Sequence, residues 1–481
     1  MNKKYQVLRC GRLYDGVTQE WKSGQSILVE DHLIAEVDSE VSVPEGADII
    51  DLSDCQVTPG MIDAHMHMDY FDWHTVREEV YTQSEEAKTL AIARCAEKAL
   101  CRGFTTVRHV GGITSNGYGV LDVKRAIEQG YFPGSRIVAA PMFLCSAGSH
   151  GDLSQGFARN PLLSQKLQQE RLTLGAGKDY FVNAVREQVK YGSDFLKIMA
   201  TGGFFTPYDT PIQQQLNDEE LKAIMDTAHA LGKTVTAHVY TNELMQKLIA
   251  FGIDGMEHGS LMNRETAQLI EEKGLYLVPT FCPYEEAVHY DPEEIKKKQP
   301  EFRRKLELYK DALQAGREVI CSSKIKLGYG TDFVANHQNY ESGYEYEAWL
   351  NSGMDPFAAL KAATSVNADI LQLSDKIGTI EPGKYADISA WKRDLMHDTR
   401  ALLDCAFVMK EGKVYDTESC LEYHIAYAKR SIIKRNTPPA AWTEQQCSFV
   451  TSNYSRKNSL TNSWRERGTH GFIFPCIPLL L

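Results

Sequence analysis

The sequence lacks the patterns that would place it in a membrane or in an oxidising compartment. No apolar run reaches the length of a transmembrane helix, and no apolar stretch follows the lysines of the N-terminal MNKKYQVLRC, as a secretory signal would require. The 11 cysteines are scattered and odd in number and include no C-x-x-C pair, which is typical of reduced thiols rather than of a disulfide framework. We therefore expect a cytoplasmic protein.

An excess of basic residues and a phosphate-binding loop are missing as well. The formal net charge of −12 disfavours nucleic acid and anionic membranes as the main partners. The Gly-rich stretches GGITSNGYG and ATGGF match neither a P-loop nor a dinucleotide fingerprint, so no nucleotide phosphate site is expected. A small-molecule substrate is the partner class that remains, and the sequence leaves open whether copies of the chain associate.

Two stretches far apart in the chain, residues 1–56 and 372–423, share one pattern. The first 56 residues alternate apolar and polar positions between turns that contain Gly and Asp, which predicts antiparallel strands. IGTIEPGKYADISAW and CAFVMKEGKVYD return to this pattern near the other end. We expect residues 1–56 and 372–423 to form one small β-sandwich domain. Residues 424–481 are basic and polar without stable periodicity, which predicts a poorly ordered C-terminal extension.

Residues 57–371 alternate short β-branched runs with helical segments such as NDEELKAIMDTAHALG. Eight such runs are present: TPGMIDAHMHM, TTVRHVG, RIVAAPM, DFLKIMA, TVTAHVY, GMEHGS, YLVPTF and IKLGYGTD. Eight strand–helix units close a (β/α)₈ TIM barrel, whose active sites lie at the C-terminal ends of the strands. The sequence therefore predicts an α/β protein with a TIM-barrel catalytic domain.

Two histidines end the first of these runs. Alternation along a strand puts His65 and His67 on one face and Met66 on the other. Two neutral imidazoles side by side make half of a zinc-type site. The pair alone is a weak sign of a metal, because histidine pairs are also common on protein surfaces.

Lys197 lies among apolar residues in FLKIMA, where an unpaired ammonium would be costly. One interpretation is an edge lysine that reaches solvent, or one in a structural ion pair. The other is a desolvated, neutral amine that captures CO₂ as a carbamate, whose two oxygens can bridge two cations.

Three further candidate ligands stand at the ends of predicted barrel strands. His238 lies near the end of TVTAHVY, His258 near the end of GMEHGS, and Asp332 ends IKLGYGTD. One histidine in such a place is usually a satisfied core residue. Four histidines, a lysine and an aspartate at C-terminal strand ends instead indicate a metal site.

Taken together, these motifs resemble the metal-dependent amidohydrolase superfamily, from the TPGMIDAHMH entry strand to the GTIEPGKYADI exit strand. KIMATGG, TAHVY and GSHGD are most similar to its prolidase, Xaa-dipeptidase and ochratoxinase-like branch. The resemblance implies two divalent metal ions. His65, His67 and Asp332 would hold one, and His238 and His258 the other, with carbamylated Lys197 between them. Zn²⁺ suits this ligand set best, and Mn, Fe and Co are not excluded.

The resemblance also implies a reaction. A hydroxide held between the two metals would attack a carbonyl carbon, and Asp332 would act as general base and pass the proton to the leaving amine. Tyr240 lies two positions after His238 and is a candidate to hydrogen-bond the substrate carbonyl, its alternative being an aromatic residue that packs against a loop. His150, in GSHGD, is a candidate to bind a substrate carboxylate.

Three functions are compatible with parts of this pattern. The first is hydrolysis of a C–N bond in dipeptides or N-acyl amino acids. The second is a cyclic amidase or deaminase of the same superfamily, for example one that acts on an imidazolone ring, but such mononuclear members need no bridging carbamate. The third is a scaffold that has lost catalysis, which would lack ligands, whereas all six are present here.

Overall fold

The computed structural model describes residues 3–69, 83–112, 118–152, 154, 159–162, 165, 174–206, 208–289, 292–298, 300–332 and 342–417. All the described residues belong to the first of the two units into which the chain divides, Met1–Leu421. The predicted extension, residues 424–481, lies outside the described residues. Among the helices that the structure describes, none combines the length and the apolar composition needed to cross a membrane.

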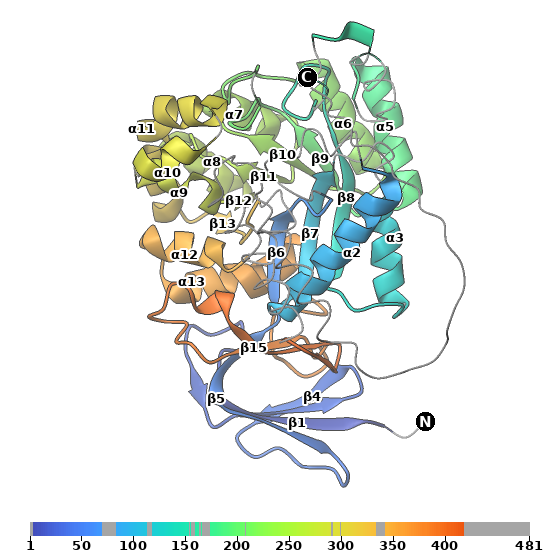
Figure 1. Cartoon of the computed structure of the whole chain (residues 1–481), viewed down its shortest axis with the longest axis vertical. Coiled ribbons are helices and arrows are strands. Elements are labelled where there is room, and N and C mark those ends of the chain that lie inside the picture. Colours follow the sequence, from blue (N-terminus) through green and yellow to red (C-terminus); the bar gives the residue numbers. More distant parts are fainter. Residues whose placement is uncertain are drawn as a thin grey trace, which may run out of the picture. The chain divides into compact units, whose positions relative to one another are not determined.

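An eight-stranded parallel sheet forms the centre of the first unit (Figure 1). In sheet order, which is also chain order, its strands are β6 (Met61–Met66), β7 (Phe104–Gly112), β8 (Arg136–Leu144), β9 (Leu196–Met199), β10 (Val235–Val239), β11 (Gly255–His258), β12 (Tyr276–Val278) and β13 (Lys326–Leu327). Each contains residues of one of the eight predicted runs, so the expected TIM-barrel-like α/β fold is confirmed.

The two edges of this sheet are connected by the segment that follows β13. The backbone N–H of Ala64 donates to the carbonyl of Tyr329 (2.9 Å), and that of Asp332 donates to the carbonyl of His65 (2.8 Å). Asp332 is thereby fixed next to β6, although it lies 267 positions after His65 in the chain.

Helices follow most of the strands, and their ends carry the expected capping residues. Asn217 begins α6 with a full capping box to Glu220, and Asn263 caps α8, which stops at Gly274 in a left-handed conformation. Among the described residues, the helices of at least six residues are α2 (Glu85–Cys101), α3 (Gly119–Glu128), α5 (Lys178–Tyr191), α6 (Asp218–Ala230), α7 (Asn242–Ala250), α8 (Arg264–Lys273), α10 (Pro292–Lys297), α11 (Pro300–Ser322), α12 (Tyr344–Asn351) and α13 (Pro356–Lys361).

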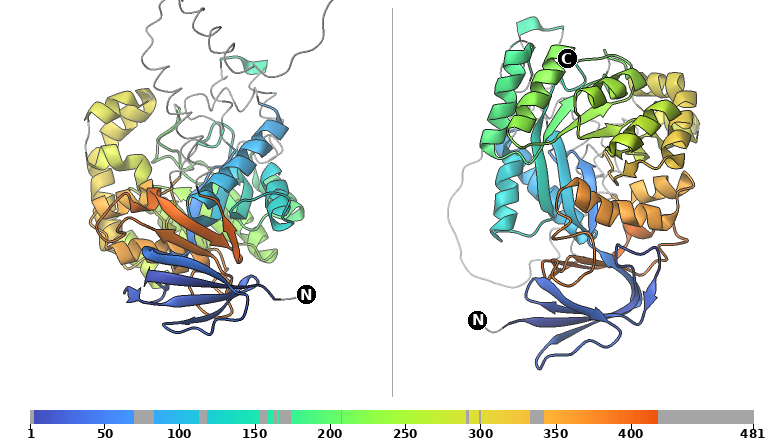
Figure 2. Two further views of the ribbon diagram at one scale, coloured as in Figure 1. Left: turned by 60° about the horizontal axis from the view of Figure 1, so that its bottom comes forward. Right: turned by 180° about the vertical axis from the view of Figure 1, so that it is seen from behind.

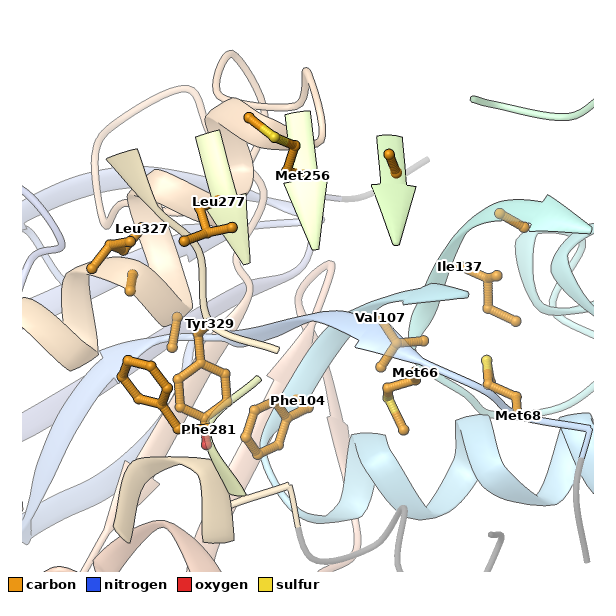
Figure 3. Close-up of a cluster of buried hydrophobic side chains, with 14 of the residues drawn as sticks. Met66, Met68, Phe104, Val107, Ile137, Met256, Leu277, Phe281, Leu327 and Tyr329 are labelled. Atoms are coloured by element: carbon orange, nitrogen blue, oxygen red, sulfur yellow. The ribbon is translucent and has the colours of Figure 1, made fainter. Parts of the chain in front are cut away.

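Apolar side chains fill the space between this sheet and its helices (Figure 3). All nine residues of β7 are buried, as expected for a parallel strand that is covered on both faces. Phe104 at its start stacks on Tyr329, with ring centroids 6.0 Å apart. The sheet is therefore a rigid support for residues at its strand ends.

A second sheet combines strands from both ends of the described chain (Figure 2). Its order is β16 (Lys413–Tyr415), β15 (Cys405–Lys410), β14 (Ile388–Trp391), β5 (Asp48–Pro59), β1 (Tyr5–Leu13), β3 (Ser26–Glu30) and β4 (Leu33–Asp38), and β2 (Lys22–Ser23) pairs with β1. The antiparallel pairing of β5 with β14 joins the two ends. The predicted two-layer sandwich is not confirmed, because this hydrogen-bonded path forms one sheet.

Trp391 links this second sheet to the barrel. Its ring is fully buried, and its Nε1 donates to the Thr58 hydroxyl at 3.1 Å. Gly103, just before β7, has φ +85°, and a Cβ there would lie 2.7 Å from the Trp391 ring. Glycine is thus required at this position both by the backbone conformation and by the close approach of the indole.

We predict that Trp391→Ala lowers the free energy of unfolding by about 3–5 kcal/mol, because it leaves a cavity between the two sheets. Urea denaturation of both proteins measures the difference. Val414→Ala is the matched control: Val414 lies in the same sheet but is 43% exposed, so a change within about 0.5 kcal/mol is expected. Equal losses in the two variants would contradict the assigned role of Trp391.

Candidate metal centre

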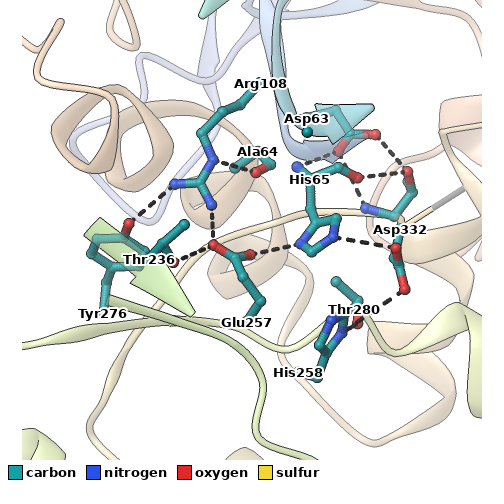
Figure 4. A network of polar contacts seen from close by, with 12 residues as sticks. Asp63, Ala64, His65, Arg108, Thr236, Glu257, His258, Tyr276, Thr280 and Asp332 are labelled. Carbon is teal, nitrogen blue, oxygen red and sulfur yellow. Dashed lines mark hydrogen bonds and ion pairs between the residues drawn. The ribbon is translucent and has the colours of Figure 1, made fainter. Parts of the chain in front are cut away.

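Three of the predicted ligands, His65, His67 and Asp332, meet at the C-terminal end of the barrel strands. Figure 4 shows two of them, His65 and Asp332, facing one another. One ligand atom each of His65, His67 and Asp332 lies within 4.8 Å of the others. The Nε2 atoms of His65 and His67 lie 3.2 Å and 3.3 Å from the same Asp332 oxygen. Burial would raise the pKa of the Asp332 carboxyl, but His65 and His67 lower it well below its usual value.

In the His65 and His67 rings, the hydrogen-bond partner of Nδ1 determines whether Nε2 has a lone pair for a metal ion. Nδ1 of His65 lies 2.6 Å from a Glu257 oxygen, and Nδ1 of His67 lies 2.6 Å from the Gly111 carbonyl oxygen. Both partners are acceptors, so both Nδ1 atoms carry the proton. In the neutral rings, the two Nε2 lone pairs then face a carboxylate oxygen. Three acceptors this close repel one another unless a cation or proton lies among them, which fits a metal site.

His258 and His238 continue the cluster. The His258 ring lies 5.0 Å from that of His65, and its Nδ1 is 3.9 Å from Asp332. The His238 ring lies 4.6 Å from that of His258, and its Nε2 is 3.3 Å from the Gly202 carbonyl oxygen. His258 is the last residue of β11, and His238 is the second-last residue of the neighbouring strand β10. All five histidine and aspartate ligands predicted from the sequence are thus in one continuous group.

Lys197 lies on β9 and is fully buried. Its Nζ makes no hydrogen bond with any residue that the structure describes. Burial lowers the pKa of the amine to about 8, against the opposing effect of Glu257 and Asp332. Since an unpaired, desolvated ammonium is unfavourable, the site favours a neutral amine or a modified one.

The backbone at the strand ends adopts an uncommon conformation. His258, Thr280 and Asp332 have φ of +69°, +47° and +52°, in the left-handed region that non-glycine residues rarely occupy. The Thr280 hydroxyl lies 2.8 Å from His258 Nδ1. Strain of this kind persists where the surrounding structure enforces it, which is common at functional sites.

Glu257 and Arg108, which were not identified from the sequence, form a buried ion pair that holds the ligand His65. Glu257 is fully buried; its carboxylate contacts His65 Nδ1, accepts the Thr236 hydroxyl (2.6 Å) and forms an ion pair with Arg108. Burial would raise the pKa of Glu257, but Arg108 and His65 lower it. The ion pair therefore fixes the tautomer and orientation of His65.

Two signals in the sequence point to this pair. Arg108 in TTVRHVG and Glu257 in GMEHGS are charged residues within buried strands, and such residues require a partner of opposite charge. Asp63 was missed as well. Its carboxylate accepts the N–H of His65 (3.0 Å) and the hydroxyl of Thr331 (2.9 Å), so it holds the residue next to Asp332 against β6.

Tyr240 and His150 both lie beside the predicted ligands. The Tyr240 ring stacks on His258 with centroids 5.3 Å apart, and its hydroxyl is 2.5 Å from that of Tyr284, which the sequence did not indicate. The His150 ring stacks on His238, with centroids 4.5 Å apart and ring planes 19° apart. The Tyr240 ring also packs in a buried cluster with the aromatic rings of Phe204 and Tyr284.

We predict that Glu257→Gln destabilises the fold by about 3–5 kcal/mol, because it leaves the Arg108 charge buried without its counter-ion. Chemical denaturation tests this. In an Arg108→Met background, the same substitution should cost clearly less. Lys222→Met, which breaks an exposed ion pair on α6, is the control and should cost less than about 1 kcal/mol. Additive effects of the two buried substitutions would contradict their coupling.

Comparisons with known proteins indicate the family of the chain. Residues 56–417 match the amidohydrolase family model. The chain is 27% identical over 437 residues to the ochratoxinase of Aspergillus niger, covering 86% of this chain and 87% of that protein. It is similar to the crystal structure of a Xaa-Pro dipeptidase with bound methionine in the active site (28% identity, TM-score 0.76, 86% and 100% of the two chains).

A third similar protein is a prolidase whose crystal structure contains N-methylphosphonate-L-proline (25% identity, TM-score 0.73, 86% and 100% of the two chains). The family match extends over most of the sequence and includes all six predicted ligands. The chain therefore belongs to the amidohydrolase family and is a hydrolase that acts on carbon–nitrogen bonds.

Proposed function

We propose that the protein is a metal-dependent hydrolase that cleaves the amide bond of dipeptides or N-acyl amino acids. The observation that carries this proposal is the set of acceptors around Asp332, with the His65 and His67 Nε2 atoms at 3.2 Å and 3.3 Å from one of its oxygens. Such a set is suited to a divalent cation. The buried amine of Lys197, which has no hydrogen-bond partner among the described residues and feels the charge of Asp332, supports a second cation.

In this proposal His65, His67 and Asp332 would hold one metal ion, and His238 and His258 would hold the other. The Lys197 amine would add to the carbon of CO₂ with loss of one proton, and the resulting carbamate would be a further ligand for the ions. Zn²⁺ is the ion that suits these ligands best, with Mn, Fe and Co as alternatives. When bound, such ions generate a nucleophile from water at neutral pH and polarise the substrate carbonyl.

The side chains of this chain would then move the protons and orient the substrate. Asp332, as general base, takes a proton from the attacking water and delivers it to the nitrogen of the leaving amine. The Tyr240 hydroxyl donates to the carbonyl oxygen, where negative charge develops, while Tyr284 holds that hydroxyl in place. His150 binds the carboxylate of the substrate.

The substrate class is supported by the names of the similar proteins. A Xaa-Pro dipeptidase and a prolidase act on dipeptides, and these proteins match this chain over most of its length. A small molecule with a carboxylate next to the cleaved amide would engage both the metal centre and His150. The same superfamily contains cyclic amidases and deaminases, which are the alternative that the substrate test must address.

We predict that the purified protein, supplied with Zn²⁺ and bicarbonate, releases amine from a defined subset of dipeptides or N-acyl amino acids. A fluorogenic amine reagent detects turnover across a library of both. Asp332→Asn, purified in parallel, controls for contaminating peptidases and should be slower by at least about a hundredfold. Silence across the library, with ammonia released from cyclic amides or aminopyrimidines, would replace the proposal by the deaminase alternative.

We also predict that Lys197→Ala loses half or more of the bound metal, because the two ions lose their common ligand. Inductively coupled plasma mass spectrometry measures the metal content, and a carbamate carbon signal in ¹³C-bicarbonate NMR spectra should disappear. Lys410→Ala is the matched control, since Lys410 is also buried but donates to the Gly134 carbonyl, before the start of β8. Full metal content and activity in Lys197→Ala would refute the carbamate.

A further inference from the structure

The segment that follows β12, residues 281–285, brings Tyr284 next to Tyr240. The hydroxyls of the two tyrosines lie 2.5 Å apart, and both residues are 1% exposed. Tyr284 is the last residue of a 3₁₀ helix, Cys282–Tyr284, and a helix of three residues makes few hydrogen bonds of its own. The position of the Tyr284 hydroxyl therefore depends on the elements that pack against this segment.

Glu345 of α12 binds the segment from one side. It is fully buried, and its two carboxyl oxygens accept the backbone N–H groups of Phe281 and Cys282, each at 2.8 Å. The oxygen that accepts from Phe281 also accepts from Nε1 of Trp349, at 2.9 Å. All three partners are N–H donors. An amide nitrogen in place of either oxygen would therefore face a donor and leave at least one N–H without an acceptor.

Arg317 of α11 binds the same segment at its two ends. Its guanidinium donates to the Phe281 carbonyl (2.8 Å) and forms an ion pair with Glu285. The guanidinium also lies over the Phe281 ring, 4.4 Å from the ring centroid. Because Arg317 is itself buried, these contacts form away from bulk water, where they are stronger than on the surface. The first and last residues of the segment are thus connected through one side chain.

The two helices together hold Phe281 by both of its backbone polar groups, the N–H through Glu345 and the carbonyl through Arg317. The Phe281 ring packs against Trp349 of α12, with centroids 5.8 Å apart. The N–H of Tyr284 donates to the same Phe281 carbonyl at 3.1 Å, so the turn closes on the residue that the helices hold. A shift of this turn would break contacts with both helices at once.

We propose that Glu345 and Arg317 are positioning residues that hold the Tyr284 hydroxyl against Tyr240, and that Tyr240 thereby keeps its orientation toward the substrate carbonyl. A hydroxyl has one proton, so Tyr240 can donate to the substrate only if Tyr284 supplies the proton of the bond between them. The effect on catalysis rests on the proposed function, because it acts through the substrate contact assigned to Tyr240.

Crystal structures of the full-length protein and of Glu345→Gln test the positioning directly and need no substrate. The substitution keeps the volume of the side chain and removes one acceptor. We expect the Tyr284 oxygen to move more than about 3.5 Å from the Tyr240 oxygen, beyond hydrogen-bond distance. Arg317→Met, which removes the other connection, should give the same displacement if Glu345→Gln does not fold. An unchanged contact between the two tyrosines in the folded variants would overturn the proposal.

Kinetics on a substrate from the amine-release library distinguish positioning from a merely structural role. Because negative charge develops on the carbonyl oxygen in the transition state, Glu345→Gln should lower kcat about tenfold and leave KM within about twofold. In a Tyr240→Phe background, Glu345→Gln should lower kcat no further. Glu347→Gln is the matched control on the same helix: its carboxylate lies 3.7 Å from Arg400, and both constants should stay unchanged.

Failure of this proposal can be distinguished from failure of the proposed function. Effects of the Glu345 and Tyr240 substitutions that multiply, or a raised KM with unchanged kcat, would overturn the positioning role. A library that yields no substrate would instead count against the proposed function, and the crystal structures would still decide whether Glu345 and Arg317 hold Tyr284 in place.

Discussion

The ion pair between Arg108 and Glu257 is the contact on which the rest of the metal centre depends. Its two side chains come from β7 and β11, and they also bond to Ala64 and His65 of β6, to Thr236 of β10 and to Tyr276 of β12. Five strands of one sheet are thus tied together below the ligands. Two charges without solvent require this many partners, since each remaining proton or lone pair would otherwise be left unsatisfied.

The centre is built on that support in successive layers. Glu257 orients His65, Asp63 holds Thr331 against β6, and the next residue, Asp332, faces both histidines. The ligands therefore belong to elements that cannot shift independently. This rigidity explains why three residues at the strand ends can keep left-handed backbone conformations that they would leave if they were free.

Much of this architecture could be predicted from the sequence, because it depends on periodicity. The eight β-branched runs predict the eight parallel strands, and residues at strand ends are brought together whatever the details of the helices. The packing of side chains and the partners of buried charged residues were harder to predict from the sequence. Glu257 and Arg108 lie 149 positions apart, and Tyr284 approaches the site from a 3₁₀ helix, Cys282–Tyr284, whose placement follows from tertiary contacts alone. The second sheet was predicted as a union of both chain ends, but its expected two-layer form was not confirmed.

The union of both chain ends in one sheet has a consequence for how the protein is made. Thr58 of β5 and Ser389 of β14 are hydrogen-bonded neighbours, yet 331 residues separate them. During synthesis β5 leaves the ribosome long before its partner exists, and one of its edges stays open until nearly the whole barrel has been translated. Contacts this distant in sequence form slowly. The nascent chain must therefore keep the open edge of β5 from pairing with other chains until β14 has been made, a demand that the finished fold no longer shows.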